Sequence, residues 1–202
     1  MTRRFAENTC MTEAARKKPE IVVISGPSGV GKTTICKRLV ERMDNLYLSV
    51  SCTTRPKSDT EVDGEDYWFL SEQEFEQRVR TGEFLEQAEV FGSRYGTVRD
   101  NVEQALEQGK TVILEIDVQG AKQVKAVYPD AVMIFILPPT QAELAKRING
   151  RGRENGEATE RRLDGAGTEI AAGWQYFKHM VINAELEQVS KEVMQIIEGT
   201  DE

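Results

Sequence analysis

One glycine-rich segment near the start of the chain constrains its fold more than any other feature. Residues 21–25 (IVVIS) form an apolar run typical of a buried parallel strand, and residues 26–33 (GPSGVGKT) follow directly. A helix is predicted from about residue 34 to residue 43. Together these segments match the P-loop pattern G-x-x-x-x-G-K-T, in which glycine amides and a helix amino end surround phosphate oxygens. The pattern predicts a nucleoside triphosphate site, with an ordinary glycine-rich turn as the alternative.

Two side chains of this loop have separate expected roles. Lys32 can reach the β- and γ-phosphates, and the Thr33 hydroxyl can bind Mg²⁺. Lys32 is therefore a candidate catalytic residue and Thr33 a candidate metal ligand. The residues expected to bind the triphosphate nucleotide are Gly26, Pro27, Ser28, Gly29, Val30, Gly31, Lys32, Thr33 and Thr34.

Composition limits the classes of partner. A net charge of −8 and a pI near 5.0 argue against a nucleic-acid-binding surface, so an anionic ligand requires a local cluster of positive charge. No apolar run approaches the ~20 residues of a membrane span. Residues 1–19 lack an apolar signal segment and are interpreted as a flexible N-terminal extension. Cys10, Cys36 and Cys52 lack metal-ligand spacing, so we expect reduced thiols in a cytoplasmic protein.

The pattern along the chain predicts one α/β domain with a doubly wound parallel sheet. In such a sheet the ligand lies at the carboxyl ends of the strands. Gly165 and Gly167 weaken the prediction of one of the helices. The segments assigned to this core are strands at 46–51, 111–117, 131–137 and 179–183, and helices at 99–108, 121–127, 141–148, 157–172 and 186–197.

Residues 51–98 have a different pattern from the core. Aromatic and apolar residues predict short strands at 66–70, 84–91 and 94–98. A capping box at Ser71 predicts a helix that continues to about Thr81. We interpret the segment as a small β-rich insertion between two parts of the core, at about 20–50 and 99–202.

Within the insertion, the sequence T-T-R at 53–55 is followed by E-x-x-G-x-x-Y-x-F at 61–69. These motifs resemble those of the guanylate kinase family. The resemblance continues through 114–120 (LEIDVQG) and an arginine-bearing segment at 147–163, and it covers about residues 20–198. It implies a P-loop NTPase fold with a GMP-binding insertion and a mobile lid at about 149–166. It also implies transfer of the γ-phosphoryl group of ATP to GMP, with Mg²⁺ as cofactor.

The resemblance also implies which side chains bind GMP. Guanine presents N1–H and its 2-amino group as adjacent donors, and Glu86 and Asp117 are the matched carboxylate acceptors. The hydroxyls of Ser51 and Thr97 can donate to O6. Adenine would leave both carboxylates unpaired, a penalty able to give discrimination on the order of 10⁴-fold. The GMP-binding residues implied are Ser51, Arg55, Tyr67, Glu86, Tyr95, Thr97 and Asp117.

The acceptor is an anionic phosphate oxygen, so positioning and charge neutralisation supply the catalysis and no strong base is needed. By resemblance Arg147, Arg151 and Arg162 are lid and clamp residues, whereas Arg153 and Arg161 are expected to be solvated. The catalytic set implied is Lys32, Arg55, Arg147, Arg151 and Arg162.

The chain departs from the family pattern at two places. Ser58 occupies the position where the family has a second basic residue, so either Lys57 replaces that cation or the GMP phosphate is held less tightly. Residues 183–185 read Asn-Ala-Glu, where Asn-Asp-Asp is more common, and we expect little effect. Asp117 also has an alternative role as a carboxylate held to Mg²⁺ through water.

Two other functions are alternatives to a guanylate kinase. A non-catalytic peptide-binding module of this fold would be expected to have a degraded P-loop, whereas residues 31–33 (GKT) are complete. A P-loop kinase for another phosphorylated acceptor, such as a sugar phosphate, is disfavoured by the guanine-matched carboxylates and supported only by Ser58.

Overall fold

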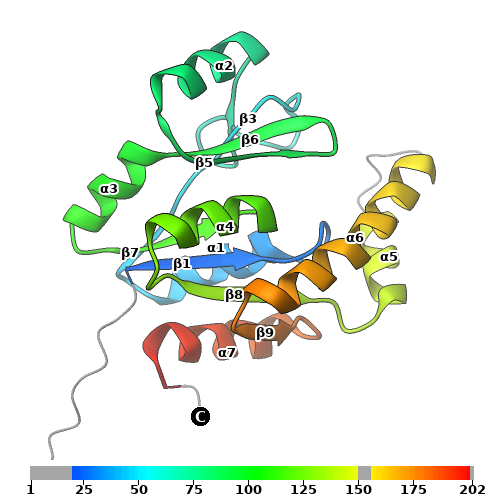
Figure 1. Ribbon diagram of the computed structural model, residues 1–202. Coiled ribbons are helices and arrows are strands. Elements are labelled where there is room, and N and C mark those ends of the chain that lie inside the picture. Colours follow the sequence, from blue (N-terminus) through cyan, green and yellow to red (C-terminus); the bar gives the residue numbers. More distant parts are fainter. Residues whose placement is uncertain (1–19, 150–155, 201–202) are drawn as a thin grey trace, which may run out of the picture.

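The computed structural model describes residues 20–149 and 156–200, and the expectations for residues 1–19 and 150–155 lie outside these ranges. Five parallel strands form the main sheet, as the sequence predicts (Figure 1). In spatial order the strands are β2 (Leu46–Leu48), β7 (Thr111–Glu115), β1 (Ile21–Ser25), β8 (Val132–Leu137) and β9 (His179–Ile182).

Both faces of this sheet are buried, which explains why its strands are apolar along their whole length. In β1, Val22 and Ile24 belong to one hydrophobic cluster, and Ile21 and Val23 belong to a second cluster on the other face. Helices α1 (Lys32–Arg42), α5 (Gln141–Asn149) and α7 (Leu186–Glu198) contribute to the first cluster. Helices α3 (Arg99–Glu107) and α4 (Val118–Val127) contribute to the second.

A second, four-stranded sheet is built within residues 52–98 and lies above α4 in the view of Figure 1. Helix α2 (Glu72–Thr81) packs on it, and its predicted capping box is confirmed: Ser71 accepts from the Glu74 N–H, and the Glu74 carboxylate accepts from the Ser71 N–H. In spatial order the strands are β4 (Trp68–Phe69), β3 (Cys52–Thr53), β6 (Ser93–Val98) and β5 (Phe84–Val90).

Several predicted boundaries were wrong, most of all those of the strand at 46–51 and of the helices at 121–127 and 157–172. The strand predicted at 46–51 ends at Leu48, because the chain there leaves the main sheet for β3. Helix α4 begins at Val118 because Asp117 caps it by accepting from the Gly120 N–H. Helix α6 (Gly156–Tyr176) is longer than predicted; in it a Cβ at Gly173 would lie 2.8 Å from the Phe135 ring, so close packing requires that glycine.

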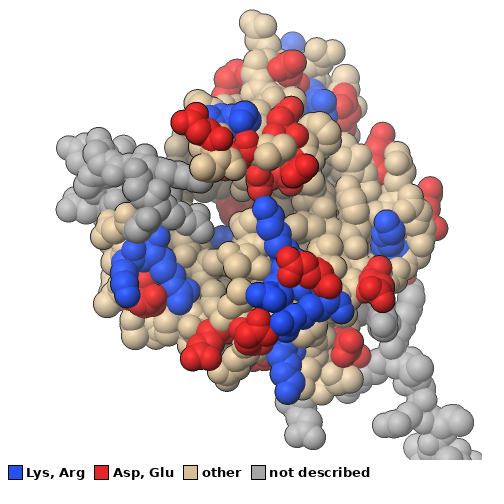
Figure 2. Space-filling model, turned by 180° about the vertical axis from the view of Figure 1, so that it is seen from behind, with Lys and Arg blue, Asp and Glu red and all other residues tan. Residues whose placement is uncertain are grey.

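None of the helices within residues 20–149 and 156–200 is long and apolar enough to cross a membrane. Seen from behind, the molecule presents basic and acidic side chains intermingled (Figure 2). Several basic and acidic side chains of the described residues form ion pairs, such as Arg42 with Glu187 at 2.6 Å. Cys36 and Cys52 are buried free thiols.

Candidate active site

The P-loop connects β1 to α1 with a backbone that requires glycine. Gly26, Gly29 and Gly31 have φ values of 144°, 83° and 105°, a region that side chains disfavour. A Cβ at Gly26 would lie 2.4 Å from the Ile136 carbonyl oxygen. Within the described residues no side chain caps the amino end of α1, so its first N–H groups remain available for an anionic ligand.

The predicted P-loop cation lies over this loop. The Lys32 ammonium donates to the carbonyl oxygens of Gly26 at 2.6 Å and Pro27 at 3.2 Å. The ammonium is thus held at the loop and adds positive charge to that of the helix end. Its position is suitable for an interaction with phosphate groups.

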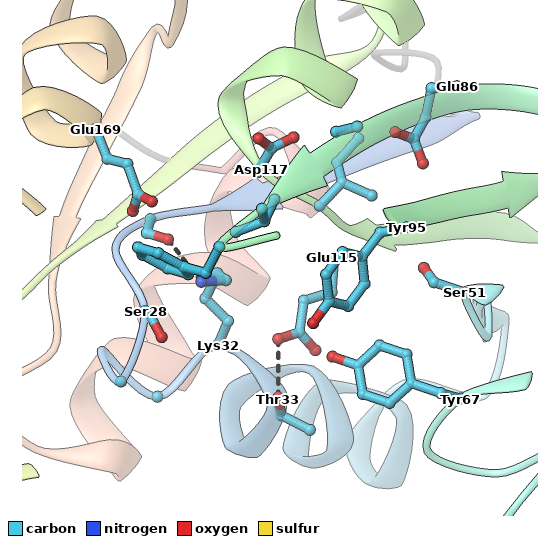
Figure 3. Close-up of a pocket in the computed structure, with 17 residues that line it drawn as sticks. Ser28, Lys32, Thr33, Ser51, Tyr67, Glu86, Tyr95, Glu115, Asp117 and Glu169 are labelled. Carbon is cyan, nitrogen blue, oxygen red and sulfur yellow. Dashed lines mark hydrogen bonds between the residues drawn. The ribbon is translucent and has the colours of Figure 1, made fainter. Parts of the chain in front are cut away.

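Glu115, the last residue of β7, is a site residue that sequence analysis did not identify. The Thr33 hydroxyl donates to its Oε1 atom at 2.8 Å (Figure 3). Thr33 lies in the first turn of α1, which follows β1 and the P-loop, and Glu115 ends β7, the strand paired in parallel with β1. Within the described residues no group of three acidic, histidine or cysteine side chains could hold a metal by itself. Thr33 and Glu115 nevertheless supply hard oxygen donors of the kind that Mg²⁺ prefers, and nucleotide phosphates would supply others.

Glu86 is a carboxylate buried in the second sheet, with 3% of its surface exposed. It accepts a hydrogen bond from the Thr97 hydroxyl at 2.6 Å, and the two residues are paired across β5 and β6. Burial raises the pKa of Glu86 to about 7, and the nearby Asp117 carboxylate adds to this effect. Thr97 itself is fully buried and directs its proton to Glu86, so it supports the carboxylate instead of facing the cavity.

Arg55 lies beside Tyr67, with its guanidinium carbon 5.4 Å from the ring centre. It forms a bidentate ion pair with Glu61, at 3.1 and 2.8 Å. Burial opposes ionisation of Glu61, but hydrogen bonds from Arg55 and Ser58 hold its pKa at about 2. The Lys57 ammonium donates to the Glu61 carbonyl oxygen at 2.8 Å, so it lies at the same loop.

The Arg147 guanidinium contacts a backbone carbonyl of the P-loop. It donates to the carbonyl oxygens of Val30 at 3.3 Å and Asn183 at 3.2 Å. Asn183 is buried and also donates to the Val30 oxygen, at 2.8 Å, so its amide has a structural role that sequence analysis did not anticipate. Arg151 and Arg153 lie outside the described residues; Arg161 and Arg162 fall within α6, but their side chains are not described.

These residues surround a cavity made of two adjoining pockets at the carboxyl ends of the parallel strands. One part is lined by the P-loop, Glu86 and Asp117, and a second part by Arg55, Lys57 and Ser58. The residues common to both parts are Ser28, Thr33, Ser51, Tyr67, Tyr95 and Glu115. Of the predicted GMP-binding residues, the structure brings all except Thr97 to the wall of this cavity.

The parallel sheet and the phosphate-binding loop at its strand ends define a P-loop NTPase, with a second cavity wall suited to an additional ligand. Comparison with known proteins narrows this class. The family model for guanylate kinase matches residues 18–200. The chain belongs to the guanylate kinase family.

Individual relatives agree with this assignment. The chain is 47% identical over 182 residues to a guanylate kinase of Symbiobacterium thermophilum, covering 90% of this chain and 86% of the relative. It is 50% identical to a guanylate kinase of Thermosynechococcus vestitus, covering 88% and 93%. The crystal structure of guanylate kinase from Anaplasma phagocytophilum superimposes with a TM-score of 0.76 at 33% identity, covering 90% of this chain and 86% of that one.

Proposed function

We propose that the chain transfers the γ-phosphoryl group of ATP to GMP, giving ADP and GDP. The observation that carries this proposal is the cavity itself, because the P-loop and the two carboxylates Glu86 and Asp117 line the same space. A phosphate-binding loop at one wall suits the donor nucleotide. Two carboxylate groups at the other suit the adjacent N–H donors of guanine. We further propose that the chain acts in the cytoplasm, where its buried thiols remain reduced.

In this proposal the residues act by positioning and by neutralising charge. Lys32 and the N–H groups of the P-loop hold the transferred phosphate, and Arg55 holds the phosphate of GMP. Thr33 and Glu115, whose side chains are hydrogen-bonded to each other, would hold Mg²⁺. When bound, this ion would neutralise charge on the phosphate oxygens. Arg147 holds the loop in place through the carbonyl oxygen of Val30. The acceptor oxygen of GMP is already anionic, so no side chain needs to remove a proton.

A coupled assay of ADP release tests the function directly. With ATP and Mg²⁺, we expect strong turnover with GMP and little with AMP, CMP or UMP. The variant Lys32→Ala, compared at equal thermal stability, should lose turnover by more than about 10²-fold because a transition-state cation is removed. If ATP binds but no nucleoside monophosphate is phosphorylated, the proposal that GMP is the acceptor is wrong. The search would then turn to other phosphorylated acceptors or to peptide partners.

A second experiment tests whether Asp117 contacts guanine or the metal ion. If its carboxylate reads guanine, Asp117→Asn should raise the KM for GMP more than the KM for ATP. The reverse order would instead place Asp117 on the metal side of the site.

The altered clamp at Ser58 can be tested by restoring the basic residue. Ser58→Arg should lower the KM for GMP if the natural chain holds the phosphate less tightly, since an arginine fork adds charged hydrogen bonds. Lys57→Ala should raise that KM if Lys57 replaces the missing cation. Each result distinguishes one of the two expectations stated for this position.

A further inference from the structure

The carboxylate of Glu169 lies close to the P-loop, whose own groups are suited to binding anions. It lies on α6, lines the cavity with Lys32 and Asp117, and points from α6 toward the P-loop (Figure 3). Burial raises its pKa, and the Asp117 carboxylate adds to this, whereas the Lys32 ammonium and the Ser28 backbone N–H oppose it. The carboxylate points toward the P-loop (Figure 3) and shares the cavity wall with Lys32 and Ser28.

A half-buried carboxylate near a triphosphate site needs a compensating role. Burial of a charge is unfavourable unless hydrogen bonds or an opposite charge offset it, and this carboxylate would also repel bound phosphates. Its neighbours on α6 indicate what the helix does here. Ala166, one turn earlier, is buried in the cluster that contains Val30 of the P-loop. A Cβ at Gly165 would lie 3.5 Å from the ring of Phe91, in the β5–β6 turn.

We propose that Glu169 is a positioning residue for phosphoryl transfer, which fixes α6 on the P-loop by accepting the Ser28 N–H. Position 162 lies seven residues earlier, close to two helical turns, so the two positions share one face of α6. The resemblance implies that Arg162 is a clamp for the phosphates. The contact at Glu169 would then fix the position of this face of α6, and with it position 162, relative to the P-loop. This inference rests on the proposed function.

Three substitutions separate the hydrogen bond from the charge. Glu169→Ala removes both and should lower kcat by about 10- to 100-fold, the range expected when catalytic groups are misplaced by about 1 Å. The KM values for ATP and GMP should change by less than about threefold, because ground-state contacts remain. Glu169→Gln keeps an oxygen acceptor for the Ser28 N–H and should recover most of kcat. Glu169→Asp keeps the charge but shortens the side chain, and should resemble the alanine variant.

Thr168→Ala is the matched control, since Thr168 is exposed, adjacent on α6 and outside the cavity wall. Its kcat should be unchanged. Thermal unfolding of each variant identifies any that fails to fold. If the alanine variant does not fold, the glutamine and aspartate variants decide: higher kcat in the glutamine variant supports the proposal, and the opposite order overturns it.

Two further results would overturn the inference. One is a kcat for Glu169→Ala within twofold of the unsubstituted chain; the other is an equal loss in the alanine and glutamine variants. The unsubstituted chain is assayed first with ATP and GMP. Absence of turnover there contradicts the proposed function and this inference with it. Normal turnover with an unaffected alanine variant contradicts this inference alone.

Discussion

Strand β1 is covered by large apolar clusters on both faces of the five-stranded sheet, whereas the four-stranded sheet covers one small cluster. The buried members of the small cluster are Cys52, Phe75 and Phe84. The smaller sheet relies more on polar contacts, such as the ion pair between Arg94 and Glu76 at 2.9 Å. Because apolar burial is the main source of stability, the small sheet should open at lower free energy than the main sheet.

Leu85 of β5 is buried in the apolar cluster of the main sheet, and the other contacts between the two sheets include polar ones. Two glutamines of α4 donate to the backbone of β5: Gln123 to the Gln87 oxygen at 2.7 Å, and Gln119 to the Glu89 oxygen at 3.1 Å. The Lys37 ammonium of α1 pairs with Asp66 at 2.9 Å. Water can replace such contacts at modest free-energy change. The comparison therefore predicts a stable scaffold for the P-loop and a separately opening wall that carries Glu86.

The largest expected effect is that of Phe135→Ala in the main sheet. Phe135 is fully buried in β8, with its ring centre 5.2 Å from that of Phe177. We expect a loss of about 3–5 kcal/mol in the free energy of unfolding, because a large cavity remains. Denaturant unfolding measures this loss, which should affect ATP binding and GMP binding together.

The matched substitution in the small sheet is Phe75→Ala. Phe75 is also fully buried and stacks on Phe84 at 4.6 Å. A similar local loss of up to about 3–5 kcal/mol should open residues 52–98 while the main sheet remains protected. Amide hydrogen exchange measures this, and binding assays should show lost GMP affinity with ATP affinity retained. A uniform loss of protection in both sheets would contradict the comparison.

The third prediction concerns pH. Folding raises the pKa of Glu86 from about 4.5 to about 7, so the folded chain holds a proton that the unfolded chain releases between these values. The free energy of unfolding should therefore fall as pH rises from about 4.5 to 7, by at most about 1.4 kcal/mol per pH unit. Glu86→Gln should remove this contribution. An identical pH dependence in both proteins would show that Glu86 does not titrate in this way.

The smallest expected effect is that of the ion pair between Lys37 and Asp66. Both side chains are partly exposed, so Lys37→Ala should change stability by only about 0.2–1 kcal/mol. Salt screens exposed charges, and the difference between the two proteins should shrink as ionic strength rises. A loss above about 2 kcal/mol would show that the sheets are joined more strongly than their polar contacts suggest.

Sequence predicted most of the elements, because local signals determine them. The P-loop glycines and the capping box at Ser71 act through neighbouring residues, and both were identified without a structure. Glu115 and Glu169 were missed, because each gains its role from a residue far away in sequence. For a similar reason, sequence analysis assigned the Thr97 hydroxyl to the O6 atom of guanine. Only the pairing of β5 with β6 reveals that its hydroxyl donates to Glu86.

The pairing of Arg55 with Glu61 has a consequence for the thermodynamics of binding. An arginine side chain loses about 2 kcal/mol of rotational entropy when it is fixed in one conformation. The two hydrogen bonds that Arg55 donates to Glu61, and the Tyr67 ring beside its guanidinium, already restrict this side chain. Most of that entropy is therefore lost when the chain folds, not when a phosphate arrives. Arg55 would thereby be preorganised for the phosphate that we propose it binds.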